Sequence, residues 1–191
     1  MSERTYHHGD LRRAVLAAAL DVISADGPAA LSLRDLARRA GVSHAAPAHH
    51  FGDRAGLVTA IAAEGYELLA GALAQAPDLR ERGVAYVRFA LDHPAHFQVM
   101  FQPDLYRGDD PDLVAAKERA SAELRAGITS LAATPEPRTA GIAAWSLAHG
   151  FATLLLSHNL TGPFDGRDPE EMFRALSSLL FTADRRQLPG E

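Results

Sequence analysis

Cysteine is absent from the 191-residue chain, which excludes disulfides and thiolate metal sites and suits a reducing cytoplasm. Lysine is scarce: of the 19 basic residues, Lys117 is the one lysine. No run of 18 apolar residues occurs and the first ten residues are polar, so we expect neither a membrane span nor a signal peptide. Segments with the apolar–polar alternation of strands are also lacking. These absences predict a cytoplasmic, all-α protein.

Charge is unevenly divided along the chain. Residues 1–55 contain seven arginines against six acidic residues, and five of the nine histidines. Residues 56–191 contain twelve basic and eighteen acidic residues. A near-neutral, histidine-rich segment on an acidic remainder is expected if only that segment meets an anionic partner. Chance variation in surface charge is an equal alternative at this point.

Apolar residues recur with the period of an α-helix through most of the chain. Asp10 is placed to cap the first such segment, and glycines and prolines mark where the segments end. We therefore predict about nine helices, over residues 10–25, 33–40, a short segment after Ser43, 53–76, 78–93, 94–101, 111–133, 138–159 and 169–184.

Gly41 and Val42 join the second and third predicted helices with the spacing of a helix-turn-helix. Gly41 can take the left-handed conformation that turns one helix against the next, and we expect Val42 to hold that turn against the core. We expect Ser43 to cap the helix after the turn and Asp53 to cap the following helix. In a helix that starts at Ser43, Pro47 removes about one backbone hydrogen bond.

Two stretches, LSLRDLARRAGVS and the HFGDRAGL that follows it, resemble the DNA-binding domain of the TetR family of bacterial transcriptional repressors. The resemblance covers residues 11–69, and WSLAHG at residues 145–150 is similar to a subgroup of that family. It implies a helix-turn-helix head over residues 1–55, closed by the start of the 53–76 helix, and an effector-binding and dimerisation domain over residues 56–191. It further implies a homodimer that binds a near-palindromic DNA operator and leaves it when a small molecule binds, with no enzymatic activity, cofactor or metal.

The resemblance also assigns residues to the DNA, some facing phosphates and others facing base edges. The implied DNA-binding residues are Ser32, Arg34, Ser43, His44, Ala45, Ala46, His49 and Arg54. The chain departs from the family at Ala48, where relatives carry a tyrosine that commonly contacts a phosphate. Its loss removes about one hydrogen bond, on the order of 1 kcal/mol per protomer. A family member with weakened DNA binding is therefore an alternative.

The resemblance places a dimer interface in the helices 138–159 and 169–184. The first of these is apolar on two faces, and a monomer usually covers only one, although a central core helix has the same pattern. The expected effector pocket is mostly apolar with few polar groups. Its candidate residues are Tyr86, Phe89, Phe97, Met100, Phe101, Trp145 and His149. For His149, a core histidine satisfied by its neighbours is the alternative.

His93 and His96 have a spacing that can seat a metal on one helical turn. Pro94 starts a new helix between them and no acidic residue follows at ligand spacing, so we predict no metal site. The alternative function is a helical metal-dependent or small-molecule enzyme that uses these two histidines with His149 and His158. No nucleophile triad, glycine-rich phosphate loop or paired-carboxylate motif supports that enzyme.

Overall fold

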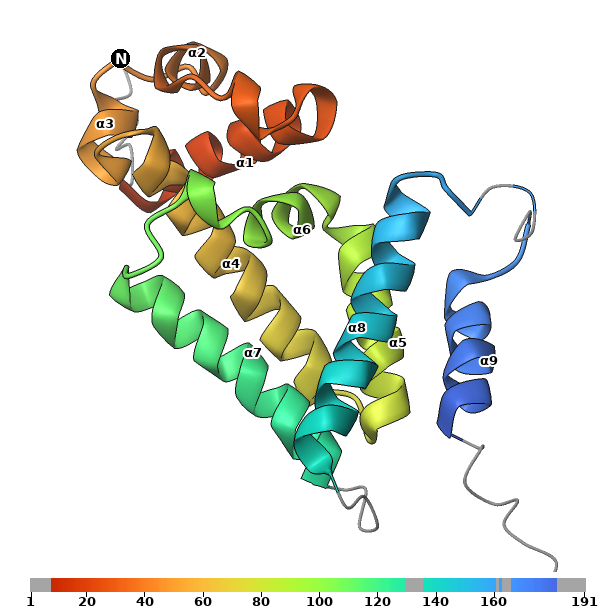
Figure 1. Cartoon of the computed structure of the whole chain (residues 1–191). Helices are drawn as coiled ribbons and strands as arrows, with labels where there is room; N and C mark the ends of the chain where they lie inside the picture. The colour runs from red at the N-terminus through yellow and green to blue at the C-terminus, as the bar shows by residue number, and fades with distance from the viewer. Residues whose placement is uncertain (1–7, 130–135, 161, 163–165, 182–191) are drawn as a thin grey trace, which may run out of the picture. The chain divides into compact units, whose positions relative to one another are not determined.

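The computed structural model describes residues 8–129, 136–160, 162 and 166–181. Within these residues the chain forms nine α-helices and two short 3₁₀ helices and no strand, which confirms the predicted all-α class (Figure 1). The helices are α1 (His8–Asp26), η1 (Pro28–Ala30), α2 (Leu33–Arg39), α3 (Ala46–Phe51), α4 (Arg54–Ala74), α5 (Leu79–Asp92), α6 (Pro94–Met100), η2 (Pro103–Leu105), α7 (Pro111–Thr129), α8 (Pro137–Leu156) and α9 (Pro169–Phe181).

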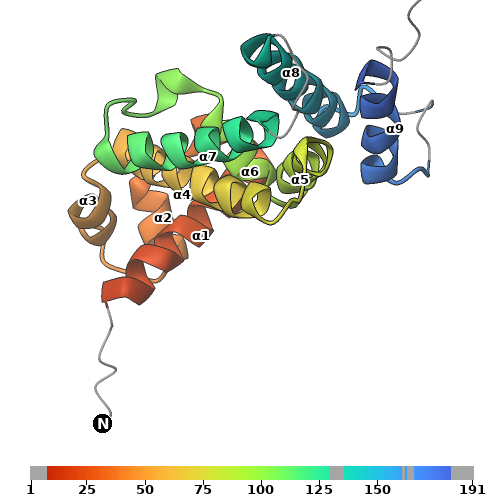
Figure 2. The same ribbon diagram turned by 90° about the horizontal axis from the view of Figure 1, so that it is seen from below.

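The helices divide into two compact units. The first comprises the chain up to Glu67 together with His93–Glu118, and the second comprises Leu68–Asp92 and the chain from Arg119 onward. Both α4 and α7 contribute residues to each unit. The division differs from the expected boundary at residue 55, because α6 and the start of α7 group with the head. In the first unit α1, α2 and α3 pack on one another in both views (Figures 1 and 2).

A single apolar cluster forms the core of the first unit. Leu36 from α2, Leu57 and Ile61 from α4 and Val99 from α6 are fully buried in it. Burying one such side chain is worth about 1.5–3 kcal/mol, so this cluster is the main reason that α6 groups with the head. Short helices such as α2 and α3 need this packing because they are too short to be stable alone.

The turn between α2 and α3 has the geometry that the sequence predicts. Gly41 has a φ of +66°. Its N–H donates to the Arg38 carbonyl at 3.3 Å, and the Val42 N–H donates to the Ala37 carbonyl at 3.0 Å. This pair of bonds is the Schellman motif, which satisfies the last carbonyls of a helix. Val42 packs against the core cluster, so both expected roles are confirmed.

Two expected helix starts are wrong. The helix α3 begins at Ala46, and Ala45 occupies its N-cap position without a side-chain cap, so Ser43 does not cap it. Pro47 is consequently the second helical residue, where the N–H has no partner within the helix, and it removes no hydrogen bond. At the other start, α1 already runs from His8, so Asp10 lies inside the first turn.

In the second unit α5 packs against both α8 and α9. The rings of Phe151 on α8 and Phe173 on α9 lie 5.8 Å apart. Arg174 on α9 donates two hydrogen bonds of 2.9 Å to the carboxylate of Glu81 on α5. A bidentate arginine–carboxylate pair has a defined orientation, so it sets the alignment of α9 on α5 in addition to the apolar packing.

Two helices, α4 and α8, pass a test of length and composition for crossing a bilayer, although neither contains an uninterrupted run of 18 apolar residues. Half of the apolar window of α4 is buried, but only 17% of that of α8. Passing this test is weak evidence for a membrane span, because core helices of water-soluble proteins pass it too. The low burial of α8 leaves an apolar surface on this helix in the single chain.

We expect Gly41→Ala to lower the free energy of unfolding by about 1–2 kcal/mol, because an alanine is strained at positive φ. No atom lies within 4 Å of the added methyl group, so strain and not a clash causes the loss. Gly71→Ala, inside α4 and equally free of neighbours, is the matched control and should stabilise the protein by up to about 1 kcal/mol. Urea denaturation measures both, and equal changes for the two variants contradict the prediction.

Candidate nucleic-acid interface and ligand pocket

The turn and helix after Gly41 carry exposed side chains on a buried anchor. His44, Ala45, Ala48 and His49 are exposed, as are three of the other expected DNA contacts, Ser43, Arg34 and Arg54. Ser32 and Ala46 are half-buried. The expected DNA-binding residues therefore all reach the surface of the first unit.

Pro47 and Phe51 are the buried anchor of α3. The Arg12 guanidinium of α1 lies 5.6 Å from the centre of the Phe51 ring, a cation–π contact. The His50 ring lies 6.3 Å from the same phenyl ring and is half-buried. Buried residues four positions apart fix the rotation of the short helix, so its other face points outward.

Arg54 opens α4 and reaches back to the segment after α1. Its Nη2 donates to the Pro28 carbonyl oxygen at 2.8 Å, which ties the start of α4 to η1. A guanidinium has five N–H donors, so this bond leaves donors for a further acceptor. Arg54 is thus a structural tie as well as an expected phosphate contact.

Asp53 caps α4, as the sequence predicts. One carboxylate oxygen accepts the Gly56 N–H at 2.9 Å, and the other accepts Arg107 Nη2 at 2.7 Å. The backbone N–H of Gly56 is the main cause that lowers the pKa of Asp53, and the positive charge of Arg107 adds to it. The cap therefore stays ionised at neutral pH.

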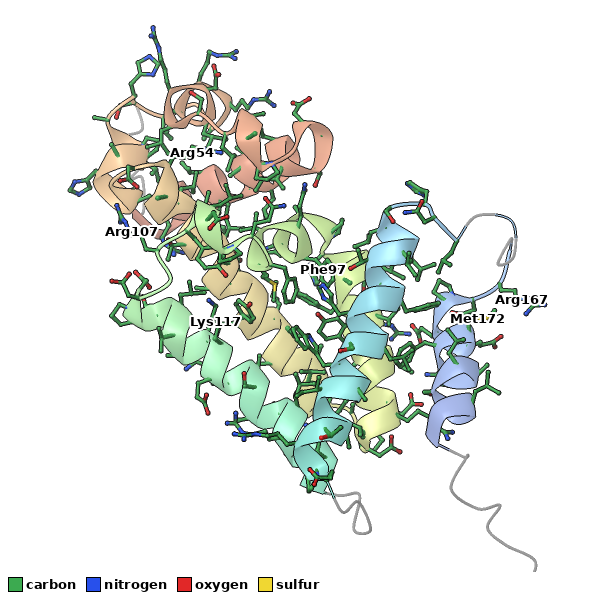
Figure 3. All side chains as sticks on the ribbon, in the orientation of Figure 1. Arg54, Phe97, Arg107, Lys117, Arg167 and Met172 are labelled. Carbon is green, nitrogen blue, oxygen red and sulfur yellow. The ribbon has the colours of Figure 1, made fainter. Side chains whose placement is uncertain are left out.

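Arg107 is a cation near the start of α4 that sequence reasoning missed, and Figure 3 labels it together with Arg54. Its backbone N–H donates to Thr59 Oγ1 at 3.0 Å, and Thr59 donates in turn to the Ala55 carbonyl at 2.7 Å. The loop before α7 is thus fastened to the first turns of α4. The partners lie 48 and 54 residues apart in sequence, so no local pattern identifies Arg107.

Three of the expected effector residues, Phe97, Met100 and Phe101, lie in the first unit. The rings of Phe97 and Phe101 are 5.1 Å apart, and Met100 is buried. The Met100 carbonyl accepts two tyrosine hydroxyls, from Tyr66 at 3.2 Å and from Tyr106 at 3.0 Å. These contacts fasten the end of α6 to its neighbours.

Lys117 on α7 completes this aromatic group, and Figure 3 shows it directed towards α4. Its ammonium lies 4.7 Å from the centre of the Tyr106 ring and 5.6 Å from that of Tyr66. Burial is the main cause that raises the pKa of the Tyr66 hydroxyl, so Tyr66 acts as a neutral hydrogen-bond donor. The one lysine of the chain therefore has a packing role.

Three other expected effector residues, Tyr86, Trp145 and His149, meet in the second unit. The Tyr86 hydroxyl lies 2.9 Å from His149 Nδ1, and the centre of the Trp145 ring lies 5.7 Å from that of the imidazole. Tyr86 and Trp145 line a cavity of about 20 Å³, with Leu79, Arg82, Gly83, Leu124, Ile128, Gly141, Ala144 and Ala148. The remaining candidate, Phe89, is buried in α5 outside this lining.

Burial lowers the pKa of His149. The imidazole is therefore neutral at physiological pH, and its Nδ1 forms one hydrogen bond with the Tyr86 hydroxyl. The two groups satisfy each other at the edge of an apolar cavity. His149 therefore has its hydrogen-bond partner in Tyr86, and it also lies next to a residue that lines the cavity.

The other histidines do not assemble into a metal site in the described residues, where no three His, Asp or Glu side chains are grouped to hold an ion. The rings of His93 and His96 lie 5.8 Å apart, and His96 Nε2 lies 3.7 Å from a Glu64 carboxylate oxygen. His93 and His96 belong to the first unit, and His149 and His158 belong to the second.

The three-helix head with its Gly41 turn defines a helix-turn-helix regulatory protein, and the second unit adds a helical domain with a small cavity. The family model of bacterial regulatory proteins of the tetR family matches residues 15–61, and the model of the tetracyclin repressor-like C-terminal domain matches residues 79–180. The chain belongs to the TetR family of transcriptional regulators.

Solved structures share the fold of this chain. A protein of unknown function from Rhodococcus sp. RHA1 is 34% identical, with 94% of this chain and 98% of that chain covered and a TM-score of 0.77. The TetR family regulator PfmR from Thermus thermophilus is 23% identical, covering 90% and 99%, with a TM-score of 0.68. LfrR from Mycobacterium smegmatis, solved with proflavine, is 21% identical, covering 94% and 99%, with a TM-score of 0.63. A search of curated proteins found no match.

We expect protonation of His149 to lower the stability of the protein as the pH falls. Because the folded-state pKa lies below the ordinary value of 6.5, the unfolded chain takes up the proton at higher pH than the folded chain. The free energy of unfolding therefore falls as the pH drops through the window just below 6.5. His149→Asn should remove this part of the decrease, measured by urea denaturation at several pH values. An NMR titration that gives His149 a pKa of 6.5 or higher contradicts the prediction.

Proposed function

We propose that this TetR family regulator is a homodimeric repressor that binds a near-palindromic operator in the bacterial cytoplasm and leaves it when a small molecule binds. The observation that carries the DNA-binding part is the exposure of His44, Ala45, Ala48 and His49 beside the buried Pro47 and Phe51. A helix anchored in this way can enter the major groove with its first residues leading.

The proposed DNA-contacting side chains divide by chemistry into base contacts and phosphate contacts. His44 can donate to a base acceptor or a phosphate, and the methyl groups of Ala45 and Ala46 can pack on a thymine methyl group. Ser32, Arg34, Ser43, His49 and Arg54 supply hydroxyl, guanidinium and imidazole donors to the phosphates. Phosphate contacts give affinity and orientation, whereas few groups here read bases, so shape readout contributes to the specificity.

The proposed dimer interface uses α8 and α9. Ile142 and Leu154 on α8 are 59% and 43% exposed in the single chain, and Leu179 on α9 is 74% exposed. Exposed apolar side chains on two neighbouring helices favour burial against a second copy. The proposed ranges are residues 138–159 and 169–184, of which residues 182–184 lie outside the described part of the chain.

Release from DNA follows from a population shift. A dimer whose two heads fit successive half-sites, about one helical turn or a little more apart, binds the operator. The dimer also has a second conformation, in which the spacing of the heads does not fit the operator. A small molecule that binds this second conformation more tightly shifts the population towards it and so lowers the affinity for DNA. The cavity beside Tyr86 and Trp145 is the proposed site of that molecule.

A mobility-shift titration with the DNA that flanks the protein's own gene tests the proposal. We expect retardation that weakens steeply with salt, because arginine contacts release counterions from the phosphates. His44→Ala should weaken binding to that DNA, and Arg80→Ala, at an exposed position of α5, is the control. A purified protein that retards no DNA at low salt contradicts the proposed function.

Ala48→Tyr should strengthen operator binding by on the order of 1 kcal/mol per protomer, because it adds a phosphate hydrogen bond from the exposed face of α3. Ala74→Tyr, at an exposed position at the end of α4, is the matched control and should leave the affinity unchanged. Fluorescence anisotropy with labelled operator at two salt concentrations measures both. An unchanged affinity for Ala48→Tyr means that this position does not face DNA.

Leu154→Arg should shift the protein from dimer to monomer in sedimentation equilibrium, because an arginine cannot be buried unpaired in an apolar interface. Val114→Arg is the control, since Val114 on α7 is 49% exposed and lies outside α8 and α9. Loss of the dimer should also weaken operator binding. A variant Leu154→Arg that stays dimeric refutes the proposed interface.

A further inference from the structure

Arg82 is the one charged residue in the lining of the cavity described above, and its guanidinium is only partly satisfied. Its Nη1 lies 3.0 Å from a carboxylate oxygen of Glu123 and also donates to the Glu123 backbone carbonyl. The side chain is 12% exposed, and Nε is fully buried. Within the described part of the chain no atom accepts the Nε–H.

A buried N–H without an acceptor is unfavourable, and native proteins rarely keep one without a reason. In this cavity the neighbouring polar group is already engaged, because the Tyr86 hydroxyl lies 2.9 Å from His149 Nδ1. The rest of the lining consists of aliphatic side chains, glycines and Trp145. The cavity therefore has a mostly apolar surface, and one residue of its lining carries a buried hydrogen-bond donor that has no acceptor among the described residues.

We propose that the effector cavity takes an apolar, uncharged molecule with a carbonyl oxygen, such as an aryl ketone, ester or amide, and that this oxygen accepts the Arg82 Nε–H. This inference rests on the proposed small-molecule regulation and names the ligand chemistry. A hydrogen bond from a charged donor is about twice as strong as a neutral one, so a single bond of this kind selects strongly.

The charge balance of the cavity favours the uncharged ligand over a carboxylate. Glu123 already pairs with Arg82 at 3.0 Å. A ligand carboxylate would therefore be attracted by Arg82 and repelled by Glu123. It must also lose its water to enter a lining that is otherwise apolar. A carbonyl group loses far less hydration and still accepts the same N–H.

The cavity must open to admit this ligand, because about 20 Å³ holds roughly one water molecule. Ile128 and Gly141 mark a place of close approach between α7 and α8, since a methyl group added at Gly141 would lie 2.4 Å from Ile128 Cδ1. Trp145 is 42% exposed, so its ring can move outward. The ligand therefore separates α8 from α7, and α8 is the helix that the proposed dimer uses.

Three probes of similar size test the ligand chemistry: acetophenone, benzoate and ethylbenzene. Trp145 is the one tryptophan of the chain, so its single indole N–H resonance reports on the cavity without interference. We expect acetophenone to shift this resonance with an affinity about tenfold or more above that of ethylbenzene, and benzoate to bind more weakly than acetophenone. Equal binding of acetophenone and ethylbenzene, tighter binding of benzoate, or no binding of any probe overturns the inference.

Two substitutions at Arg82 test the role of its Nε–H. Arg82→Lys keeps a positive charge beside Glu123 but removes the Nε–H, and Arg82→Met removes all donors. Both should weaken acetophenone about tenfold or more and leave ethylbenzene within about twofold. Arg80→Met on the exposed face of the same helix is the matched control, and circular dichroism confirms that each variant is folded. Acetophenone binding that is unchanged in both Arg82 variants overturns the inference.

The same samples separate this inference from the proposed function. If acetophenone binds through Arg82 but leaves operator binding unchanged, the ligand chemistry stands and the proposed release by this cavity fails. If the protein retards DNA and the probes fail the comparisons above, the regulator stands and the ligand class is wrong.

Discussion

The left-handed turn at Gly41 is the constraint on which the DNA-binding head depends. It closes α2 with the two bonds of a Schellman motif and sends the chain back over α1, where Pro47 and Phe51 become buried. Because these two residues fix the rotation of α3, His49 faces outward, and His44 is exposed in the turn before this helix. The exposed surface proposed to read DNA is thus a consequence of backbone geometry and core packing, and it needs no special stability of its own.

The start of α4 joins the head to the rest of the first unit through polar contacts. Asp53 both caps α4 and pairs with Arg107, while Arg54 bonds to the Pro28 carbonyl. These side chains come from segments far apart in the sequence, and they meet beside the helix that carries the proposed DNA contacts. These hydrogen bonds fasten the loop that holds Arg107 to the first turns of α4.

In the second unit most of the polar groups named above have hydrogen-bond partners among the described residues and one does not. The group without such a partner suggests where a ligand binds. Arg174 and Glu81 pair in two bonds, and Tyr86 pairs with His149. Arg82 differs because one of its buried donors has no acceptor in the described residues. Apolar side chains on α8 and α9 likewise lack a partner surface, because they are exposed to solvent in the single chain. A ligand and a second copy of the chain are the proposed complements of these two features.

The sequence by itself determined the class and order of the helices, the Gly41 turn and the Asp53 cap, because helical periodicity, glycine at positive φ and capping chemistry act between residues close in the chain. The resemblance to TetR proteins named the expected DNA contacts, of which the structure exposes six and leaves Ser32 and Ala46 half-buried. The sequence failed at the start of α3, where packing of Pro47 overrides the capping preference of Ser43. Only the tertiary structure decided that Phe97, Met100 and Phe101 lie in a different unit from Tyr86 and Trp145. It alone paired Arg82 with Glu123 and Asp53 with Arg107, 41 and 54 residues apart, because such contacts arise from how helices pack and leave no local pattern.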